Sequence, residues 1–362
     1  MGFISHLLGK DKKNYTAITE DNPWPGLSSY EDPEKVVRNG HKPRLFCGRD
    51  RETHQVTQLI INNIFVTLYG QSGTGKTSLL NAGVFPQLRK RFFLPVSIRL
   101  SMDAQGQSFQ HCIINKIAET INVKQGQKKT FEVVPLASNE QQPDYLWTYF
   151  ARNHFYDCEG QSLFPIIVLD QFEEILRSRR DEAENLLRQI SFLMDESHAL
   201  PSQTINGKPY YYDFNYRFVA SIREDDLYSL EDCIDKNYLS EMKVCRYRLG
   251  SLQNASEVIL NPGEGLFKTD EQSDIANAII EKSRSKDGSI GSNIISLLCS
   301  RIYSEYCRSQ SNFITLAKVD DFIKGNPLER FYNEATRDLS NRRIRIFPWL
   351  TSTDPHDCIS RG

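Results

Sequence analysis

The chain carries at residues 70–78 the sequence Gly70-Gln71-Ser72-Gly73-Thr74-Gly75-Lys76-Thr77-Ser78. This stretch matches GxxxxGK(S/T), the pattern of the phosphate-binding P-loop. The β-branched and aromatic run at residues 64–69 comes directly before it and predicts a buried strand. The apolar residues that follow predict a helix facing a sheet: Leu79, Leu80, Ala82 and Val84. The motif therefore stands between a strand and a helix, as a P-loop requires.

The residue types of this loop explain how it would hold a nucleotide. Gly70, Gly73 and Gly75 let the backbone curl so that its N–H groups point inward, and the next helix adds positive charge at its N-terminus. Lys76 can reach the β- and γ-phosphates, and Thr77 offers a hydroxyl to Mg²⁺. We predict ATP/ADP and Mg²⁺ as ligands, with contacts from the whole motif: Gly70, Gln71, Ser72, Gly73, Thr74, Gly75, Lys76, Thr77 and Ser78.

The composition indicates a folded protein of two domains, or of one large domain with an appendage. The chain has 362 residues, and 39% of them are hydrophobic, which is enough for a substantial core. The net charge of −2 includes no basic excess, so it argues against nucleic acid as a partner. The eight cysteines form no CxxC pair, which favours reduced thiols and a cytoplasmic location.

The sequence contains no membrane segment that we can recognise. No apolar run approaches the roughly 18 residues that a span needs. The first residues have too short an apolar block for a signal peptide, and they miss the myristoylation pattern. We therefore predict a flexible leader over residues 1–22 and no membrane partner.

Strand and helix patterns alternate after the leader, which predicts an α/β fold with a parallel sheet sandwiched by helices. Pro86 is expected to end or kink the helix after the P-loop. Besides 64–69, strands are expected at residues 94–100, 164–170, 216–222 and 244–249, with Asn206-Gly207 marking a hairpin. Helices are expected at about 50–61, 109–121, 143–153 and 183–194.

Past residue 250 the pattern changes to helices only. They are expected at about 252–260, 271–283, 290–308, 317–324 and 327–338, and Ile294, Leu298, Ile302 and Tyr306 form one apolar face. We predict a P-loop NTPase domain over residues 23–250, a smaller all-α domain over 251–340 and a poorly specified tail over 341–362.

The strand at residues 164–170 ends in Asp170, and we expect this strand to lie beside the P-loop strand. A carboxylate there can hold Mg²⁺ together with Thr77, directly or through water. The alternative role for Asp170 is an N-cap of the next helix. The position after this acid, which serves hydrolysis in many ATPases, holds Gln171; an amide there could position water and would suit slow turnover.

Two carboxylates and one arginine are candidates for the rest of the chemistry. Glu173 or Glu174 can line the γ-phosphate, with Glu173 preferred; the alternative is an acidic first helical turn that suits the helix dipole. Arg223 ends the strand at 216–222 and can sense the γ-phosphate. Its alternative is a salt bridge with Asp225 or Asp226.

Together these landmarks resemble the bacterial STAND class of P-loop ATPases, specifically novel STAND NTPase 1. The resemblance covers roughly residues 23–335. It is carried by residues 23–27 (Pro-Trp-Pro-Gly-Leu), 46–52 (Phe-Cys-Gly-Arg-Asp-Arg-Glu), 69–88, 170–174 (Asp-Gln-Phe-Glu-Glu) and 221–223 (Ser-Ile-Arg).

The resemblance implies an ATP/ADP switch. ADP would hold a closed resting form, and exchange for ATP, allowed by a sensed ligand, would cause homo-oligomerisation and activate an effector. Many relatives look like intracellular surveillance or antiphage defence proteins. By the same analogy Cys47, Gly48 and Arg49 would border the base or ribose, Arg223 would sense the γ-phosphate, and residues after 250 would form a helical lid.

The chain also departs from the family pattern. Related switches often carry Gly-x-Pro in the lid, with the proline at the adenine, whereas Gly291-Ser292-Asn293-Ile294 has no proline. The chain has the pattern of a switch without recognisable sensor or effector segments. We expect a separate partner, or segments that a truncated product lacks, to supply the sensor and the effector.

The sequence is compatible with three other functions. The first is an AAA+ or origin-recognition-like ATPase that acts on DNA or protein, which the absence of a basic excess and Gln171 disfavour. The second is a small-molecule kinase, which usually needs a basic lid. The third is a nucleotide-binding scaffold without turnover. Among these functions we expect the regulatory switch, an ATPase that converts ATP to ADP and phosphate.

Overall fold

The structure, a computed structural model, describes residues 22–324 and Asn333, apart from residues 105, 125–138, 143, 154, 158, 195–203, 206–207, 210–215, 237–243, 286 and 310–312. The chain divides into two compact units. The described part of the first lies within residues 22–50, 71–83 and 250–333, and that of the second within 51–70 and 84–249. The domain limits expected from the sequence stay predictions.

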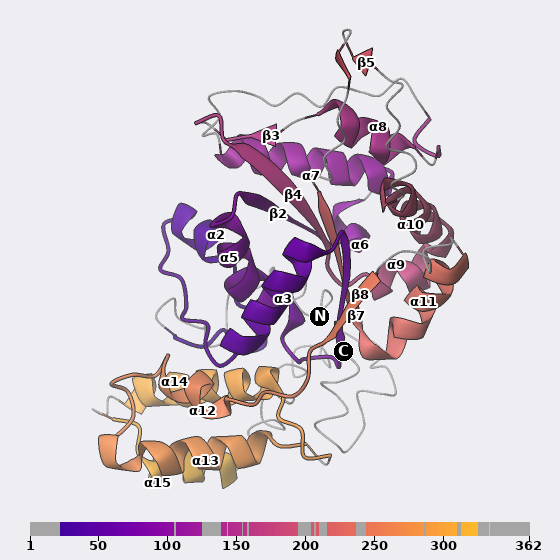
Figure 1. Cartoon of the computed structure of the whole chain (residues 1–362). Helices are drawn as coiled ribbons and strands as arrows, with labels where there is room; N and C mark the ends of the chain where they lie inside the picture. The colour runs from indigo at the N-terminus through magenta and orange to yellow at the C-terminus, as the bar shows by residue number, and fades with distance from the viewer. Residues whose placement is uncertain are drawn as a thin grey trace. The chain divides into compact units, whose positions relative to one another are not determined.

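The second unit is built on a parallel sheet (Figure 1). Five strands lie in the order β2-β4-β7-β1-β8, and every neighbouring pair on this path is parallel. Their bounds are β1 (Phe65–Gly70), β2 (Phe93–Ile98), β4 (Ser162–Leu169), β7 (Arg217–Arg223) and β8 (Val244–Arg248). The α/β class and the five strands predicted from the sequence are confirmed. A short β3 (Phe155–Tyr156), too short to show a pattern, pairs antiparallel with β4.

Helices cover both sides of this sheet (Figure 1). On one side lie α3 (Asp50–Asn62) and α5 (Phe85–Arg89); on the other lie α7 (Phe109–Lys124) and α10 (Arg180–Met194). Alternate strand residues such as Phe65, Ile167 and Phe218 share one buried cluster with the apolar face of α10. The central strands β1, β4 and β7 are buried on both faces, so apolar area is removed from water on both sides of the sheet.

The remaining elements of the second unit are short. They are α6 (Leu100–Asp103), α8 (Tyr145–Arg152), α9 (Glu173–Ser178), the 3₁₀ turn Glu224–Asp226 and α11 (Leu227–Lys236). The antiparallel pair β5 (Thr204–Ile205) and β6 (Lys208–Pro209) confirms the predicted hairpin, whose Asn206-Gly207 turn lies outside the described residues.

Pro86 is expected to end or to kink the helical stretch after the P-loop, and the structure contradicts the first of these roles, while the kink stays a prediction. The stretch begins as α4 (Lys76–Ser78), continues as a π-helical turn over Leu79–Val84 and then becomes α5. Pro86 does not end it, because Pro86 is the second residue of α5. Proline has no backbone N–H to donate to a preceding turn, and the turn before Pro86 is π-helical rather than α-helical.

The first unit is helical and has its own core. It contains α2 (Pro33–Arg38), α12 (Ala255–Leu260), the 3₁₀ turn Thr269–Glu271, α13 (Gln272–Ser283), α14 (Ser292–Ser309) and α15 (Leu316–Lys324). Ile294, Leu298 and Ile302 of α14 are buried in this core, which confirms the predicted apolar face. Trp24 joins them, and its indole Nε1 donates to the Val258 carbonyl oxygen at 2.9 Å. The helix expected at 327–338 lies outside the described residues, Asn333 excepted.

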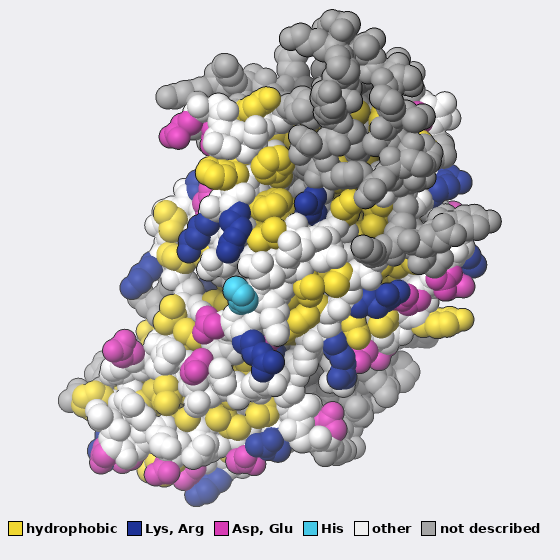
Figure 2. Space-filling view, in the orientation of Figure 1, with side chains coloured by type: hydrophobic (Ala, Val, Ile, Leu, Met, Phe, Trp, Pro, Cys, Tyr) yellow, Lys and Arg dark blue, Asp and Glu magenta, His cyan; other side chains and the backbone are white. Residues whose placement is uncertain are grey.

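The surface shows mixed charge on the face seen in Figure 2. Lys and Arg side chains stand apart from one another there, with Asp and Glu side chains among them. Within the part of the chain that the structure describes, no helix has the length and apolar character that crossing a membrane requires.

Candidate functional site

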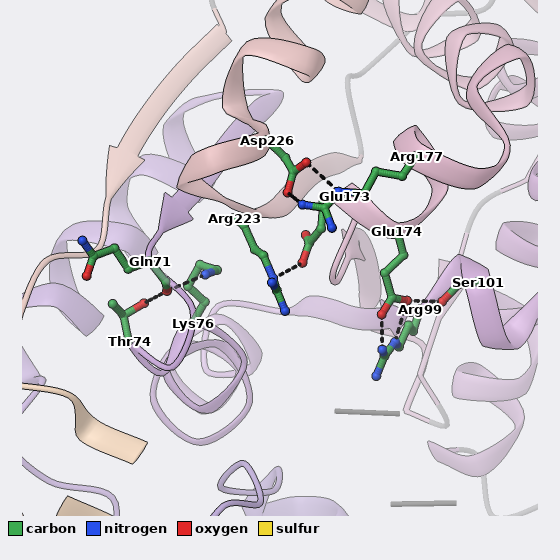
Figure 3. A network of polar contacts seen from close by, with 10 residues as sticks. All are labelled: Gln71, Thr74, Lys76, Arg99, Ser101, Glu173, Glu174, Arg177, Arg223 and Asp226. Atoms are coloured by element: carbon green, nitrogen blue, oxygen red, sulfur yellow. Dashed lines mark hydrogen bonds and ion pairs between the residues drawn. The ribbon is translucent and has the colours of Figure 1, made fainter. Parts of the chain in front are cut away.

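The P-loop follows β1 without a break. Gly73 and Gly75 have φ angles of +78° and +91°, a region that L side chains rarely adopt. The Gln71 carbonyl oxygen accepts hydrogen bonds from Thr74 Oγ1 at 2.9 Å and from Lys76 Nζ at 3.1 Å (Figure 3). The backbone therefore has the glycine-dependent curl that the sequence predicted, and the Lys76 ammonium group lies along the loop.

The P-loop is packed against two other segments of the first unit. Ser292, the first residue of α14, donates from Oγ to the Gly73 carbonyl oxygen at 3.0 Å. A Cβ atom on Gly73 would lie 2.5 Å from Asn293 Nδ2, and one on Gly75 would lie 2.9 Å from Ser292 Oγ. Glycine is therefore favoured at both positions by the backbone angles, while the close atoms belong to the Asn293 and Ser292 side chains, which can shift.

Arg49 makes a second set of contacts with the loop. Its side chain is buried, and Nη2 donates to the Thr74 carbonyl oxygen at 3.2 Å and to that of Gly250 at 3.0 Å. Nη1 donates to the Ser251 carbonyl oxygen at 3.4 Å. The resemblance to the STAND class implied that Arg49 borders the base or ribose, which stays a prediction, and no motif in the sequence indicated these backbone contacts.

Cys47 and Gly48 lie beside α12. Gly48 has a φ of +76°, and a Cβ atom there would lie 2.6 Å from Val258 Cγ2. Burial raises the pKa of the Cys47 thiol, although a hydrogen bond with Asn261 acts in the opposite direction. Cys47 is therefore a neutral thiol at physiological pH, and its expected place near the nucleotide stays a prediction.

Asp170 directly follows β4, and its backbone N–H donates to the Ile98 carbonyl oxygen at 2.9 Å. The expectation that its strand lies beside the P-loop strand is wrong, because β7 stands between β4 and β1. Arg223, the last residue of β7, is the register partner of Gly70. Of Asp170 and Arg223, it is therefore Arg223 that lies on the strand next to β1, the strand that leads into the P-loop.

Gln171 has an unusual environment. Its φ of +53° lies in the left-handed region, where few residues other than glycine occur. Among the described residues, its side-chain Oε1 is buried without a hydrogen-bond partner. The next residue is held firmly, since the Phe172 N–H donates to the Ser221 carbonyl oxygen at 3.0 Å. Strain and an unsatisfied polar atom together are typical of functional positions.

Glu173 and Arg223 form an ion pair (Figure 3). Arg223 Nε lies 3.3 Å from Glu173 Oε1, and the Glu173 side chain is 7% exposed. The alternative partner Asp226 instead accepts from Arg177, whose Nε lies 2.8 Å from Oδ1. The structure thus places two predicted site residues, Glu173 and Arg223, in direct contact, and it assigns Asp226 to another arginine.

Glu174 is bound by residues that the sequence analysis missed. Arg99 Nε donates to Glu174 Oε2 at 3.0 Å, Arg99 Nη2 donates to Oε1, and the Ser101 hydroxyl also donates to Oε2 (Figure 3). Arg99 follows the last residue of β2, within the strand that the sequence predicted, so nothing local marked it as a partner. Partial burial opposes ionisation of Glu174, but the hydrogen bonds and the Arg99 charge outweigh it and lower the pKa.

This lowered pKa predicts an acid-dependent loss of stability. The pair stabilises the fold above the ordinary glutamate pKa of 4.5, and this contribution is lost as the pH falls through the lower pKa of the folded state. We expect the midpoint of thermal unfolding of the wild type to fall more steeply below pH 4.5 than that of Glu174→Gln. Glu182→Gln, in the exposed Arg179–Glu182 pair, controls for charge removal. Parallel curves for the wild type and Glu174→Gln would contradict the assignment.

One protein family and several solved structures are similar to this chain. The family model of novel STAND NTPase 1 matches residues 23–318. Similar solved structures include Cdc6p from Pyrobaculum aerophilum, with 17% identity over 78% of this chain and 68% of that one and a TM-score of 0.48. A Walker-type ATPase of Pyrococcus abyssi has 14% identity over 88% and 78%, with a TM-score of 0.48. The ORC2 protein of Aeropyrum pernix has 14% identity over 84% and 75%, with a TM-score of 0.47. No curated protein matches the chain.

Proposed function

This chain belongs to the novel STAND NTPase 1 family, and on that premise we propose that it is an ATP-binding signalling switch with slow hydrolysis. ADP holds the resting form, and ATP produces the active, oligomeric form. Its role in the cell would be cytoplasmic surveillance, in the setting of antiphage defence. The observation that carries slow turnover is that both candidate carboxylates after Asp170 are engaged by arginine side chains.

The residues of the P-loop fit a bound nucleotide. The left-handed Gly73 and Gly75 provide the curl that turns backbone N–H groups toward an anion, and Lys76 provides the cation. Thr77 and Asp170 would hold Mg²⁺, since a hydroxyl and a carboxylate are the oxygen donors this ion prefers. When bound, Mg²⁺ would neutralise charge on the phosphates.

Arg223 is suited to sense the γ-phosphate. It is the register partner of Gly70, and its Nε already lies 3.3 Å from a carboxylate oxygen, Glu173 Oε1. A phosphate oxygen offers the same kind of charge-assisted hydrogen bond. We propose that Arg223 exchanges Glu173 for the γ-phosphate when ATP binds, and that the released Glu173 supports hydrolysis.

Slow turnover also follows from Gln171. A glutamate at this position could accept a proton from the attacking water, whereas an amide can only orient it. Glu174 is fixed by Arg99 and Ser101 and therefore serves structure in this scheme. The chain thus retains ATP long enough for ATP to act as a signal.

The test is the nucleotide that the purified protein carries. We expect ADP to co-purify, turnover to be slow, and replacement of ADP by a slowly hydrolysed ATP analogue to raise the mass measured by light scattering. A protein without nucleotide, or with the same mass in both states, would contradict the switch. Fast turnover stimulated by DNA would instead identify a loader ATPase, and phosphate transferred to an added small acceptor would identify a kinase.

A further inference from the structure

Hydrogen bonds from outside the P-loop fix two successive carbonyl groups of that loop. Ser292 Oγ donates to the Gly73 carbonyl oxygen, and Arg49 Nη2 donates to that of Thr74. All of these residues belong to the first unit. Ser292 begins an 18-residue helix, and Arg49 is 4% exposed, so both donors are well anchored.

The direction of a carbonyl group determines the direction of the next N–H group. A trans peptide is planar, and its C=O and N–H bonds point in opposite directions. Holding the Thr74 carbonyl toward Arg49 therefore directs the Gly75 N–H away from Arg49. Holding the Gly73 carbonyl toward Ser292 fixes the Thr74 N–H in the same way, and that N–H donates to the Gln71 carbonyl oxygen at 3.4 Å.

The two donors are joined through a third segment. Arg49 also donates to the carbonyl oxygens of Gly250 and Ser251. The Ser251 hydroxyl accepts from the Ile290 N–H at 2.8 Å, two residues before Ser292. These contacts form a closed ring. It runs from Thr74 through Arg49, Ser251 and residues 290–292 to Gly73, which is bonded to Thr74 along the chain.

We propose that Arg49 and Ser292 are positioning residues of the nucleotide site, which set the amide directions of the P-loop and link them to residues 250–251 and the start of α14. Through this ring the affinity for nucleotide phosphates depends on the helical segments after residue 250. The inference rests on the proposed function, because it assigns how this chain shapes a phosphate site. It goes beyond the proposed function because it assigns Arg49 to hydrogen bonds with the P-loop backbone instead of to contact with the nucleotide base.

The test compares ADP affinity with stability for Arg49→Met and Ser292→Ala. The hydrogen bonds of a charged donor contribute more than those of a hydroxyl. We expect the Kd for ADP to rise about tenfold or more for Arg49→Met and about fivefold for Ser292→Ala. Ser292→Thr, which keeps the hydroxyl, should restore most of the affinity. Because both side chains act on one loop, the double variant should lose less than the two single effects combined.

Matched controls separate positioning from general stabilisation. Arg217 is a partly buried arginine of the second unit that donates to the carbonyl oxygens of Ile61 and Tyr216. Ser304 is a serine of α14 whose Oγ donates to the Ser300 carbonyl oxygen. Arg217→Met and Ser304→Ala should lower the unfolding temperature while the Kd for ADP stays within twofold of the wild type. If Arg49→Met does not fold, Ser292→Ala and Ser251→Ala, which removes the acceptor for Ile290, test the same ring.

The outcomes are distinct. If Ser292→Ala and Ser251→Ala, together with Arg49→Met where it folds, change only the unfolding temperature and leave the Kd for ADP unchanged, the positioning role is overturned. If the wild type itself does not bind ADP, the proposed function has failed instead. Binding by the wild type, weakened binding by the ring variants and unchanged binding by both controls support the proposal.

Discussion

Replacing Lys76 by alanine is expected to abolish nucleotide retention. The ammonium group already lies along the P-loop, with Nζ donating to the Gln71 carbonyl oxygen at 3.1 Å. From there it can contact two phosphates, and each charge-assisted hydrogen bond contributes about 1.5–3 kcal/mol. Losing both would weaken binding by roughly a hundredfold or more, because about 1.4 kcal/mol corresponds to a factor of ten.

The measurement is the nucleotide released from denatured protein, together with equilibrium binding of ADP. Lys90→Ala is the matched control, since Lys90 is an exposed lysine at the end of α5, in the same helical stretch. It should retain nucleotide as the wild type does. Lys76→Ala protein that is folded and still carries ADP would contradict the assignment of the P-loop.

Replacing Arg223 by alanine is expected to remove the discrimination between ATP and ADP and also to destabilise the second unit. The Glu173 side chain is 7% exposed, so it would lose a cationic partner in a largely water-excluded place. The cost is about 3 kcal/mol, the low end for a broken buried pair, because the Arg223 side chain is itself 24% exposed. The γ-phosphate would lose its sensor at the same time.

A double variant separates these two effects. Glu173→Gln combined with Arg223→Ala removes the buried charge, so most of the stability should return in thermal unfolding. The ratio of ATP to ADP affinity should stay near one, since glutamine at 173 supplies no cation. If the double variant regains the wild-type ratio, Arg223 does not sense the γ-phosphate. Glu173→Gln alone should keep the ratio and lower the rate of hydrolysis.

Much of the fold could be predicted because its signals are local. The strand patterns around the P-loop, the apolar run that ends at Asp170 and the stripe on α10 each follow from the periodicity of neighbouring residues. The glycines of the loop are also local, since Gly73 and Gly75 adopt backbone angles that glycine tolerates best. The P-loop, the candidate acids and Arg223 were therefore identifiable from residue order alone.

Other features depend on which segments meet after folding. The sequence shows the order of strands along the chain but not across the sheet, so the place of β7 between β4 and β1 could not be predicted. The Arg99–Glu174 contact joins residues 75 positions apart, and the Ser292–Gly73 contact joins residues 219 apart. The periodicity of apolar residues along the sequence does not indicate which distant residues pair.

The sequence by itself thus determined that a phosphate-binding loop lies between a strand and a helix, because both elements and the glycine angles are set by neighbouring residues. Only the tertiary structure decided which side chains hold that loop and which partners engage the acids after Asp170. The physical reason is that hydrogen bonds and ion pairs form between complementary groups that packing brings within about 3 Å, however far apart they are in the sequence. Packing is a property of the whole chain rather than of a motif.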